Sequence, residues 1–316
     1  MNRVSIRFLA AMILPLVFTI WLILPDELFI ISLAKAFLFQ ALTALPILAL
    51  IFLLFKWKGL AAGCFLSSLI LLQFMIPFVS NDQTDFSPKD SLKVAQFNLK
   101  RNNQSYEKVV EMIKDNEAQL VSVQELDSQW MRRLEAGLRK EYPWSYGLPD
   151  ESGFYGVAVF SKRPATFKKS EMVGLENIEG TIELPTGEVH FLSSHLHVPT
   201  TPLNYKLRNQ HLRMIATWAK EKQGPVVTFG DYNTVSWDSN LKSLETEANL
   251  SRASGGWIPT YPANIFPLIP IDQIYYSEGF ACASMKGLSI PGSDHRGVMA
   301  TLAIKSHRTQ SAEQSR

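Results

Sequence analysis

Carboxylate, amide and imidazole side chains recur at the ends of short apolar segments after residue 90. In chain order they are Asn98, Glu125, His195, Asp231 with Asn233, Asp272, and Asp294 with His295. Side chains of these types serve as metal ligands and as general acids and bases. Loops at strand ends present such groups on a rigid scaffold, so their positions indicate a functional site.

Each of these residues alone is also compatible with a structural role. Asp231 and Asn233 form an Asp-x-Asn sequence, and such residues commonly cap turns and helices by bonding nearby backbone N–H groups. Glu125, at the end of an apolar segment, could simply be solvated. Asp272 lies within Ile-Asp-Gln-Ile, where a purely structural role is harder to sustain because a buried carboxylate needs a partner.

A zinc site is a further alternative. His195 and His197 are two residues apart in an expected strand, so their side chains point to the same face. A His-x-His pair is half of a typical zinc site. A third close ligand is not evident, so the sequence does not favour zinc.

The elements that must position these residues follow from hydrophobic periodicity. Strands are expected at residues 92–97, 120–123, 155–161, 181–184, 188–194, 225–229, 272–276 and 298–304, and helices around 109–113 and at 129–140 and 203–222. Several strands adjoin without an intervening helix. This order favours two packed sheets flanked by helices, an α+β fold, over a simple βαβ alternation.

Taken together, the ordered motifs resemble the endonuclease/exonuclease/phosphatase family. They are Asn, Gln-Glu, Ser-His-Leu, Gly-Asp-x-Asn, Ile-Asp-x-Ile and Ser-Asp-His, within residues 91–305. A Gly-x-Ala-x-x-Ser-Lys match at 156–162 and the Arg208-Asn209-Gln210 sequence support the resemblance. It implies a four-layer α/β/β/α sandwich and a Mg²⁺-dependent phosphoesterase. One departure is Gly297, where the family commonly has proline.

The resemblance also implies a metal site. Glu125 would be the principal Mg²⁺ ligand, helped by Asn98 and Asp294, and Mn²⁺ is a possible substitute. Oxygen ligands suit a hard cation that keeps several waters and bridges to phosphate.

Catalytic and substrate-binding roles follow from the same resemblance. The implied catalytic residues are His195, Asp231, Asn233, Asp272 and His295, and the implied substrate-binding residues are Asn233, His195 and Arg208. Asp231 would orient or deprotonate the attacking water. His295 would contact the phosphoryl group, with Asp272 fixing its ring and favouring the imidazolium form. His197 is an alternative to His195 for the active-site histidine.

The first 80 residues differ in composition from the rest. They hold five of the 31 Lys and Arg residues and two of the 29 Asp and Glu residues, which leaves residues 81–316 with a net charge near −1. Apolar stretches at 8–24, 36–55 and 59–79 approach or reach the roughly 20 residues that span a bilayer. The sequence therefore predicts a membrane anchor of three transmembrane helices in residues 1–80, a linker at 81–90, a catalytic domain at 91–305 and a disordered tail at 306–316.

Basic residues predict the topology of the anchor. Arg3 and Arg7 at the N-terminus and Lys56 and Lys58 between the second and third spans are expected inside the cell. The acidic loop at 25–27 is then outside, and Lys35 is the one dissenting charge. A cleaved signal peptide is the alternative for the first stretch, but it lacks a small-residue cleavage site and two spans follow. A multi-pass inner-membrane protein with a periplasmic or extracellular catalytic domain is expected.

The substrate is less constrained than the reaction. A short linker would hold the site near lipid headgroups, and a net charge near −1 lacks the basic surface of a nuclease. Family members with N-terminal spans of this kind include some that handle polyprenyl pyrophosphate carriers. The first hypothesis is therefore hydrolysis of a phosphate, pyrophosphate or phosphodiester bond outside the cytoplasm, on a membrane lipid such as a polyprenyl pyrophosphate carrier or on another extracytoplasmic substrate. The alternatives are a tethered nuclease acting on DNA or RNA and a non-catalytic binding protein on the same fold.

Aromatic and apolar residues at 257–262 and 265–270 form a further feature of the catalytic domain. They are expected either to touch lipid or to cover the core.

Overall fold

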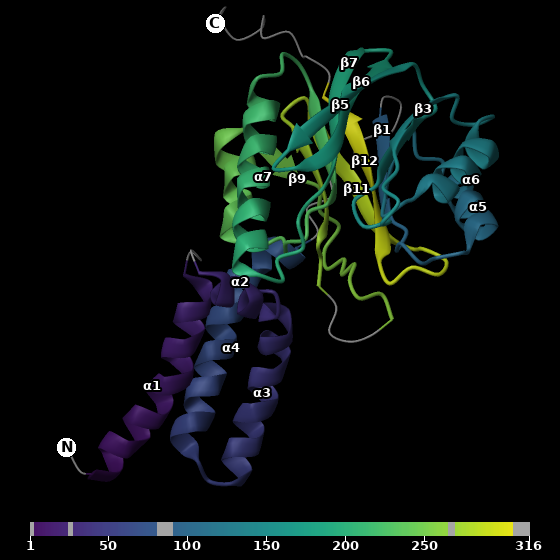
Figure 1. The fold of residues 1–316 in the computed structure, drawn as a ribbon. Helices are drawn as coiled ribbons and strands as arrows, with labels where there is room; N and C mark the ends of the chain where they lie inside the picture. Colours follow the sequence, from purple (N-terminus) through teal and green to yellow (C-terminus); the bar gives the residue numbers. More distant parts are fainter. Residues whose placement is uncertain (1–2, 25–27, 81–90, 265–268, 306–316) are drawn as a thin grey trace, which may run out of the picture.

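The computed structural model describes residues 3–24, 28–80, 91–264 and 269–305. Two six-stranded sheets pack face to face in residues 91–305 (Figure 1). The first sheet has the order β11-β12-β1-β2-β4-β3, with β1 (Ser91–Asn98), β2 (Leu120–Gln124), β3 (Trp144–Leu148), β4 (Val157–Ser161), β11 (Phe280–Ser289) and β12 (Arg296–Ile304). The second has the order β5-β6-β7-β8-β10-β9, with β5 (Ala165–Met172), β6 (Leu175–Leu184), β7 (Gly187–His195), β8 (Val226–Asp231), β9 (Leu250–Arg252) and β10 (Asp272–Ser277).

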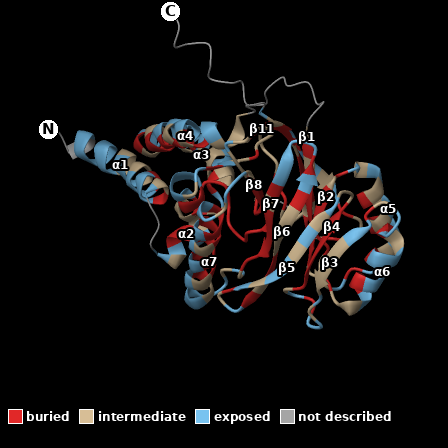
Figure 2. Ribbon diagram, turned by 90° about the horizontal axis from the view of Figure 1, so that it is seen from above, coloured by how far each residue is buried: buried red, intermediate tan, exposed pale blue. Residues whose placement is uncertain are grey.

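Helices cover the outer face of each sheet. The helices α5 (Tyr106–Asn116) and α6 (Ser128–Leu138) pack on the first sheet, and α7 (Pro202–Lys220) packs on the second. In β1 the side chains of Leu92 and Val94 enter the core between the sheets, whereas Ala95 and Phe97 face the helices, as the strand alternation requires. Figure 2 shows this buried interior. The predicted four-layer α/β/β/α sandwich is confirmed.

Two parallel strand pairs bring the functional residues to one end of the sandwich. β1 runs parallel to β2 with Asn98 opposite Gln124, and β7 runs parallel to β8 with His195 opposite Asp231. β10 pairs antiparallel with β8 and places Asp272 opposite Asp231. Because parallel strands end on the same side, their C-terminal residues meet there.

The sequence-based assignment of elements was incomplete. The strands β3, β5, β9 and β11 were not predicted, and neither were the short 3₁₀ helix Ser239–Leu241 and the π-helical turn Ser243–Glu247. The predicted linker at 81–90 and tail at 306–316 lie outside the described residues.

The N-terminal region forms α1 (Arg3–Ile23), α2 (Phe29–Lys35), α3 (Leu38–Leu54) and α4 (Lys58–Val79). Two helices, α1 over residues 5–23 and α4, are long and apolar enough to cross a membrane. α2 and α3 form a pair bent by 65°, which would make a third span if it crosses as one. Residues 29–35 lay between the first two predicted spans without an assigned element, and they form α2. Leu14 and Leu54 are 68% and 74% exposed, so large apolar side chains lie on the outer surface of this helical region.

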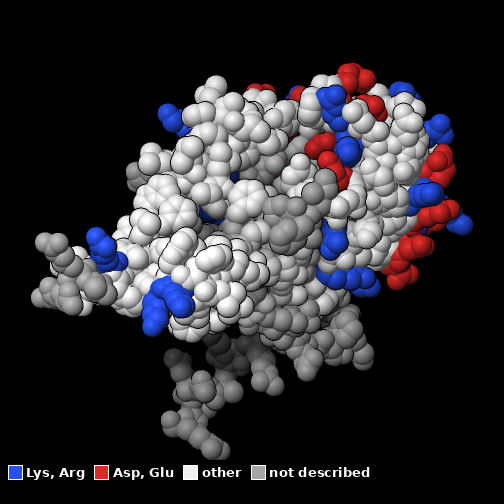
Figure 3. Space-filling view, turned by 90° about the horizontal axis from the view of Figure 1, so that it is seen from below, with Lys and Arg blue, Asp and Glu red and all other residues white. Residues whose placement is uncertain are grey.

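An apolar cluster joins these helices to the sandwich of residues 91–305. We call it the junction cluster, and its buried members are Leu22, Leu38, Leu71, Met75, Val235, Trp237 and Ile271. α2 lies at this junction, between the other helices and the sheets (Figure 1). The surface of the helical region seen from below is almost free of charged side chains, whereas Lys, Arg, Asp and Glu gather on the sandwich (Figure 3).

Candidate active site

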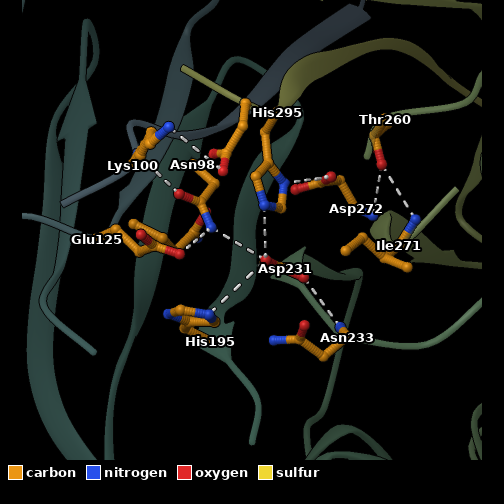
Figure 4. Close-up of polar contacts among 12 residues, drawn as sticks. Asn98, Lys100, Glu125, His195, Asp231, Asn233, Thr260, Ile271, Asp272 and His295 are labelled. Carbon is orange, nitrogen blue, oxygen red and sulfur yellow. Dashed lines mark hydrogen bonds and ion pairs between the residues drawn. The ribbon is translucent and has the colours of Figure 1, made fainter. Parts of the chain in front are cut away.

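Asn98 links the two halves of the site. It is the last residue of β1, and its amide nitrogen donates to Glu125 Oε1 at 2.8 Å and to Asp231 Oδ2 at 3.0 Å. Glu125 follows β2 with φ of 57°, and its Oε2 accepts from the backbone N–H of Arg101 at 3.0 Å. The carboxylates of the two sheets are therefore held at one amide group (Figure 4).

Asp231 lies at the centre of the site. Its Oδ2 is 3.7 Å from His195 Nε2 and 3.8 Å from His295 Nε2, and its Oδ1 accepts from the Asn233 backbone N–H at 2.9 Å. Figure 4 shows the carboxylate between the two imidazoles. Burial, together with the charge of Asp272, raises the pKa of Asp231 to about 7. This carboxyl group can therefore exchange a proton near neutral pH.

Asp272 fixes the ring of His295. The distance from Asp272 Oδ2 to His295 Nδ1 is 3.1 Å, and both side chains are buried. Burial alone would lower the pKa of His295, but the charge and hydrogen bond of Asp272 outweigh it and raise the pKa to about 9. His295 is consequently an imidazolium at neutral pH, with Nε2 directed toward Asp231 (Figure 4).

His195 is the neutral counterpart of His295. Burial, and secondly the charge of His295, lowers the pKa of His195 to about 3. His197 is directed elsewhere, because its Nε2 is hydrogen-bonded with the carbonyl of Val173 at 3.1 Å. Of the two histidines left open by the sequence, His195 is the one next to Asp231.

The arrangement of potential ligands does not favour the zinc alternative. Within the described ranges, the one group of three His, Cys, Asp or Glu residues close enough to share an ion is Asp231, Asp272 and His295, whose ligand atoms lie within 4.8 Å. Neither His195 nor His197 belongs to that group, so the His-x-His pair lacks a third ligand there.

The residues present fit a hard divalent cation. Glu125 and Asp231 are bridged by Asn98. Lys100 contacts two of the potential ligands, since its Nζ is 3.7 Å from Asp294 Oδ2 and its backbone N–H donates to Asn98 Oδ1 at 3.0 Å. Mg²⁺ is bound in proteins by oxygen ligands, such as the carboxylate and amide oxygens found here. In this geometry the Asn98 amide nitrogen faces the carboxylates, so ligation by Asn98 would require its oxygen to turn toward them.

Arg208 does not face the site, contrary to the role implied by the resemblance. Its side chain is 2% exposed, and its guanidinium donates to Asp238 Oδ2 at 2.9 Å and to the Asn233 carbonyl at 3.2 Å. Such a buried group has no free donor surface for a substrate. The structure therefore places Arg208 behind Asn233, as a support for that residue.

Several residues of the site were not identified from the sequence. The Thr260 hydroxyl accepts from the backbone N–H groups of Ile271 and Asp272 at 3.0 and 3.3 Å and so fixes the start of β10 (Figure 4). The ring of Tyr261 lies 4.8 Å from that of His295. Ser293 donates to the Asn98 carbonyl at 2.8 Å. Ser293 belongs to the Ser-Asp-His motif, which is the one sequence signal among these three.

Glu125, His195 and Asp231 thus lie at the C-terminal ends of β2, β7 and β8, and Asp272 and His295 lie at the N-terminal ends of β10 and β12. Residues 95–295 match the model of the endonuclease/exonuclease/phosphatase family. The chain is a member of this family, because the match covers more than half of it. The N-terminal helices lie outside the matched residues.

Solved structures share the fold at low sequence identity. Mannosyl-6-phosphatase of Bacteroides thetaiotaomicron is 18% identical with a TM-score of 0.56, and the alignment covers 68% of this chain and all of that one. Sphingomyelinase C of Streptomyces griseocarneus is 17% identical with a TM-score of 0.53, over 67% of this chain and 99% of that one. TDP2 of D. rerio with a single-strand DNA product is 15% identical with a TM-score of 0.55, over 67% and 98%. A search of curated proteins found no match.

Proposed function

We propose that this chain is a membrane-anchored, metal-dependent phosphoesterase that hydrolyses a phosphate or pyrophosphate ester on a lipid of its own membrane. Residues 1–80 are the anchor in this proposal, and residues 91–305 are the catalytic domain. The observation that supports a lipid substrate is the position of the site against the helices. Ile271, next to Asp272, belongs to the junction cluster, and Tyr261 packs both on that cluster and beside His295.

The aromatic and apolar segment after residue 256 takes part in this contact. Trp257 and Ile269 pack on the junction cluster, and the Trp257 ring stacks on Phe39 of α3 with centroids 3.8 Å apart. Residues 265–268 lie outside the described residues. Trp257 and Ile269 thus cover the helices, and a substrate leaving the bilayer near them would be close to the site.

The cation would be held by Glu125 with Asp294 and Asn98. When bound, it would neutralise charge on the phosphoryl oxygens and so stabilise the transition state. In this role Glu125 supplies the main ligand charge, while Asn98 also keeps Glu125 and Asp231 in a fixed relation.

Asp231 accounts for the proton of the attacking water. With a pKa near neutrality, it accepts this proton as the water oxygen bonds to phosphorus. The bond from phosphorus to the leaving oxygen breaks on the opposite side, as in-line displacement requires, and the leaving oxygen keeps the electron pair and takes up a proton from solvent water. The His295 imidazolium donates a hydrogen bond to a phosphoryl oxygen, and His195 is close enough to Asp231 to contact the same group. The Asn233 side-chain amide donates to the Leu196 carbonyl at 2.8 Å, so binding of substrate by Asn233 would require this bond to break.

The proposed topology places the catalytic domain outside the cytoplasm. The N-terminus and the turn between α3 and α4 lie at the end of the helices away from the sheets (Figure 1). Lys56 and Lys58 are at that turn, and basic loop residues favour the cytoplasmic side. The sandwich at the opposite end would then face the periplasm or the cell exterior.

The test is a Mg²⁺-dependent activity panel on the full-length protein in lipid nanodiscs. The substrates are undecaprenyl pyrophosphate, sphingomyelin, a phosphoinositide and plasmid DNA, and Asp231→Asn is the matched inactive control. We expect hydrolysis of a lipid substrate by the wild type and its loss in the control. Cleavage of DNA without any lipid would replace the proposal with the tethered nuclease. Absence of any turnover with Mg²⁺ or Mn²⁺ would favour the non-catalytic binding protein.

A further inference from the structure

The loop after β8 is buried along its whole length. Residues 231–238 include Asp231 and Asn233 of the site, and every residue in this segment is buried. Loops normally run over the surface of a protein. This one is enclosed because Val235 and Trp237 pack into the junction cluster with residues of the membrane helices. The catalytic loop therefore lies between the site and the helices.

Asp238, at the end of this loop, accepts hydrogen bonds from several segments of the chain. Its Oδ2 accepts from the hydroxyls of Ser32 in α2 at 3.3 Å and Thr234 at 2.7 Å, and from Arg208 Nη2 at 2.9 Å. Its Oδ1 accepts from the Asn240 backbone N–H at 2.9 Å. One buried carboxylate thus joins the membrane region, the catalytic loop and α7.

The connection continues from Asp238 to the catalytic carboxylate. Arg208 donates to the carbonyl of Asn233 at 3.2 Å, and the backbone N–H of Asn233 donates to Asp231 Oδ1 at 2.9 Å. Each step is a hydrogen bond between buried groups. A displacement of α2 would therefore reach Asp231 through groups that lack water as an alternative partner.

Trp237 provides a second connection between α2 and the loop. Its indole N–H donates to the carbonyl of Lys35, the last residue of α2, at 2.6 Å. Its ring stacks on Trp257 with centroids 5.8 Å apart, and Trp257 in turn stacks on Phe39. The loop is thereby attached to both segments of the bent α2–α3 pair.

We infer that α2 holds the catalytic loop in its active geometry, with Trp237 and Asp238 as positioning residues for Asp231 and Asn233. The inference rests on the proposed function in one respect, that Asp231 takes part in the reaction. The membrane region is then part of the catalytic apparatus as well as an anchor. If these contacts were merely structural, weakening them would lower thermal stability and leave turnover per folded molecule unchanged.

The experiment uses the full-length protein in nanodiscs and a soluble substrate, bis-p-nitrophenyl phosphate with Mg²⁺, so that delivery from the bilayer plays no part. Trp237→Phe keeps an aromatic ring but removes the five-membered ring with the N–H that binds the Lys35 carbonyl, and Ser32→Ala removes the α2 hydroxyl. We expect kcat to fall about tenfold in Trp237→Phe with KM unchanged, because small displacements of reacting groups cost turnover. Ser32→Ala should change kcat in the same direction.

Two matched controls carry the same substitutions away from the loop. Trp218→Phe removes an indole N–H bound to Glu179, and Ser68→Ala removes a hydroxyl that bonds the Phe65 carbonyl within α4 at 2.7 Å. Both should retain kcat. Wild-type kcat in Trp237→Phe and Ser32→Ala, or an equal loss in the controls, would overturn the inference.

A second measurement does not depend on activity. Hydrogen exchange of the full-length protein, followed by mass spectrometry, reports local opening of residues 231–238. We expect exchange there to become about tenfold faster in Trp237→Phe, as the loss of one buried hydrogen bond implies, and to stay unchanged in Trp218→Phe. If the wild type hydrolyses no phosphoester but the exchange changes, the proposed function fails and the coupling stands. Unchanged exchange at 231–238 in both loop variants refutes the coupling.

Discussion

Replacing Asp272 by asparagine removes the charge that governs two titrating groups of the site while keeping the shape of the side chain. Asp272 raises the pKa of His295 through its charge and hydrogen bond, and it raises the pKa of Asp231 by repulsion. Its loss therefore lowers both pKa values. In the wild type we expect activity to rise with pH as Asp231 deprotonates near 7 and to fall as His295 deprotonates near 9. In Asp272→Asn both limbs of the pH–rate profile should move to lower pH.

The size of the effect follows from the His295 pKa. A value of about 9 in place of the ordinary 6.5 corresponds to about 3 kcal/mol in favour of the imidazolium. If the variant ring returns to its ordinary value, about a tenth of it is charged at pH 7.5. In the variant, burial still lowers the His295 pKa, while the charges of Asp231 and Glu125 still raise it. We expect kcat/KM at pH 7.5 to fall about tenfold, with part of the loss recovered near pH 6.

The assay is a pH–rate profile of kcat/KM between pH 5 and 10 on a soluble phosphodiester. Asp127→Asn is the matched control, because Asp127 caps α6 by accepting from Trp130 N at 2.7 Å and asparagine caps equally well. The control should keep the wild-type profile. A uniform loss of activity in Asp272→Asn, with both limbs at their wild-type positions, would show that Asp272 does not govern these titrations.

Three further predictions concern the ligand, the buried ion pair and the topology. Glu125→Gln should lower Mg²⁺-dependent kcat by about 10³-fold or more with an unchanged unfolding transition, and full turnover in the folded variant would exclude Glu125 as the main ligand. Arg208→Met should lower the free energy of unfolding by about 3–5 kcal/mol, because it leaves the Asp238 carboxylate buried without its cation. Chemical denaturation of the full-length protein measures this free energy, and an unchanged value would contradict the prediction. A reporter enzyme active only in the periplasm and fused after residue 90 should be active, whereas activity of a cytoplasmic reporter at that position would reverse the topology.

The central part of the site was predictable because its residues follow recognisable strands. Asn98, Glu125 and Asp231 each lie at the end of an apolar segment, and parallel pairing brings such ends together. Asp272 between isoleucines already required a partner, and the structure supplies His295. The hydrophobic pattern and motif order therefore contained the information on which residues meet.

The edge strands could not be predicted in the same way. β5 has the sequence ATFKKSEM and lies at the edge of its sheet with most side chains at least partly exposed, and β11 at the edge of the other sheet is rich in small and polar residues. An edge strand pairs on one side only, and exposed charges there limit unwanted pairing. Neither segment therefore has the apolar pattern that identifies a strand.

Contacts between distant residues explain the remaining errors. Arg208 is a cation in a family motif, but nothing in its neighbourhood shows that Asp238, 30 residues later, binds it. The Ser32–Asp238 contact spans 206 residues. A polar or basic residue in one segment does not reveal its partner in another. The contact of Arg208 with Asn233 and the contact of α2 with Asp238 therefore required the structure.

The backbone at the site also has a consequence for stability. Lys100, Glu125 and Asn233 have φ values of 65°, 57° and 50°, a left-handed conformation that costs a non-glycine residue about 1 kcal/mol or more. Glycine would adopt these angles without strain. Glu125→Gly should therefore relieve local strain in the folded chain while removing the side chain proposed to hold the cation. The same substitution would also remove the two hydrogen bonds that the Glu125 carboxylate accepts from Asn98 and from the Arg101 backbone N–H, so the glutamate offsets the strain of its own backbone.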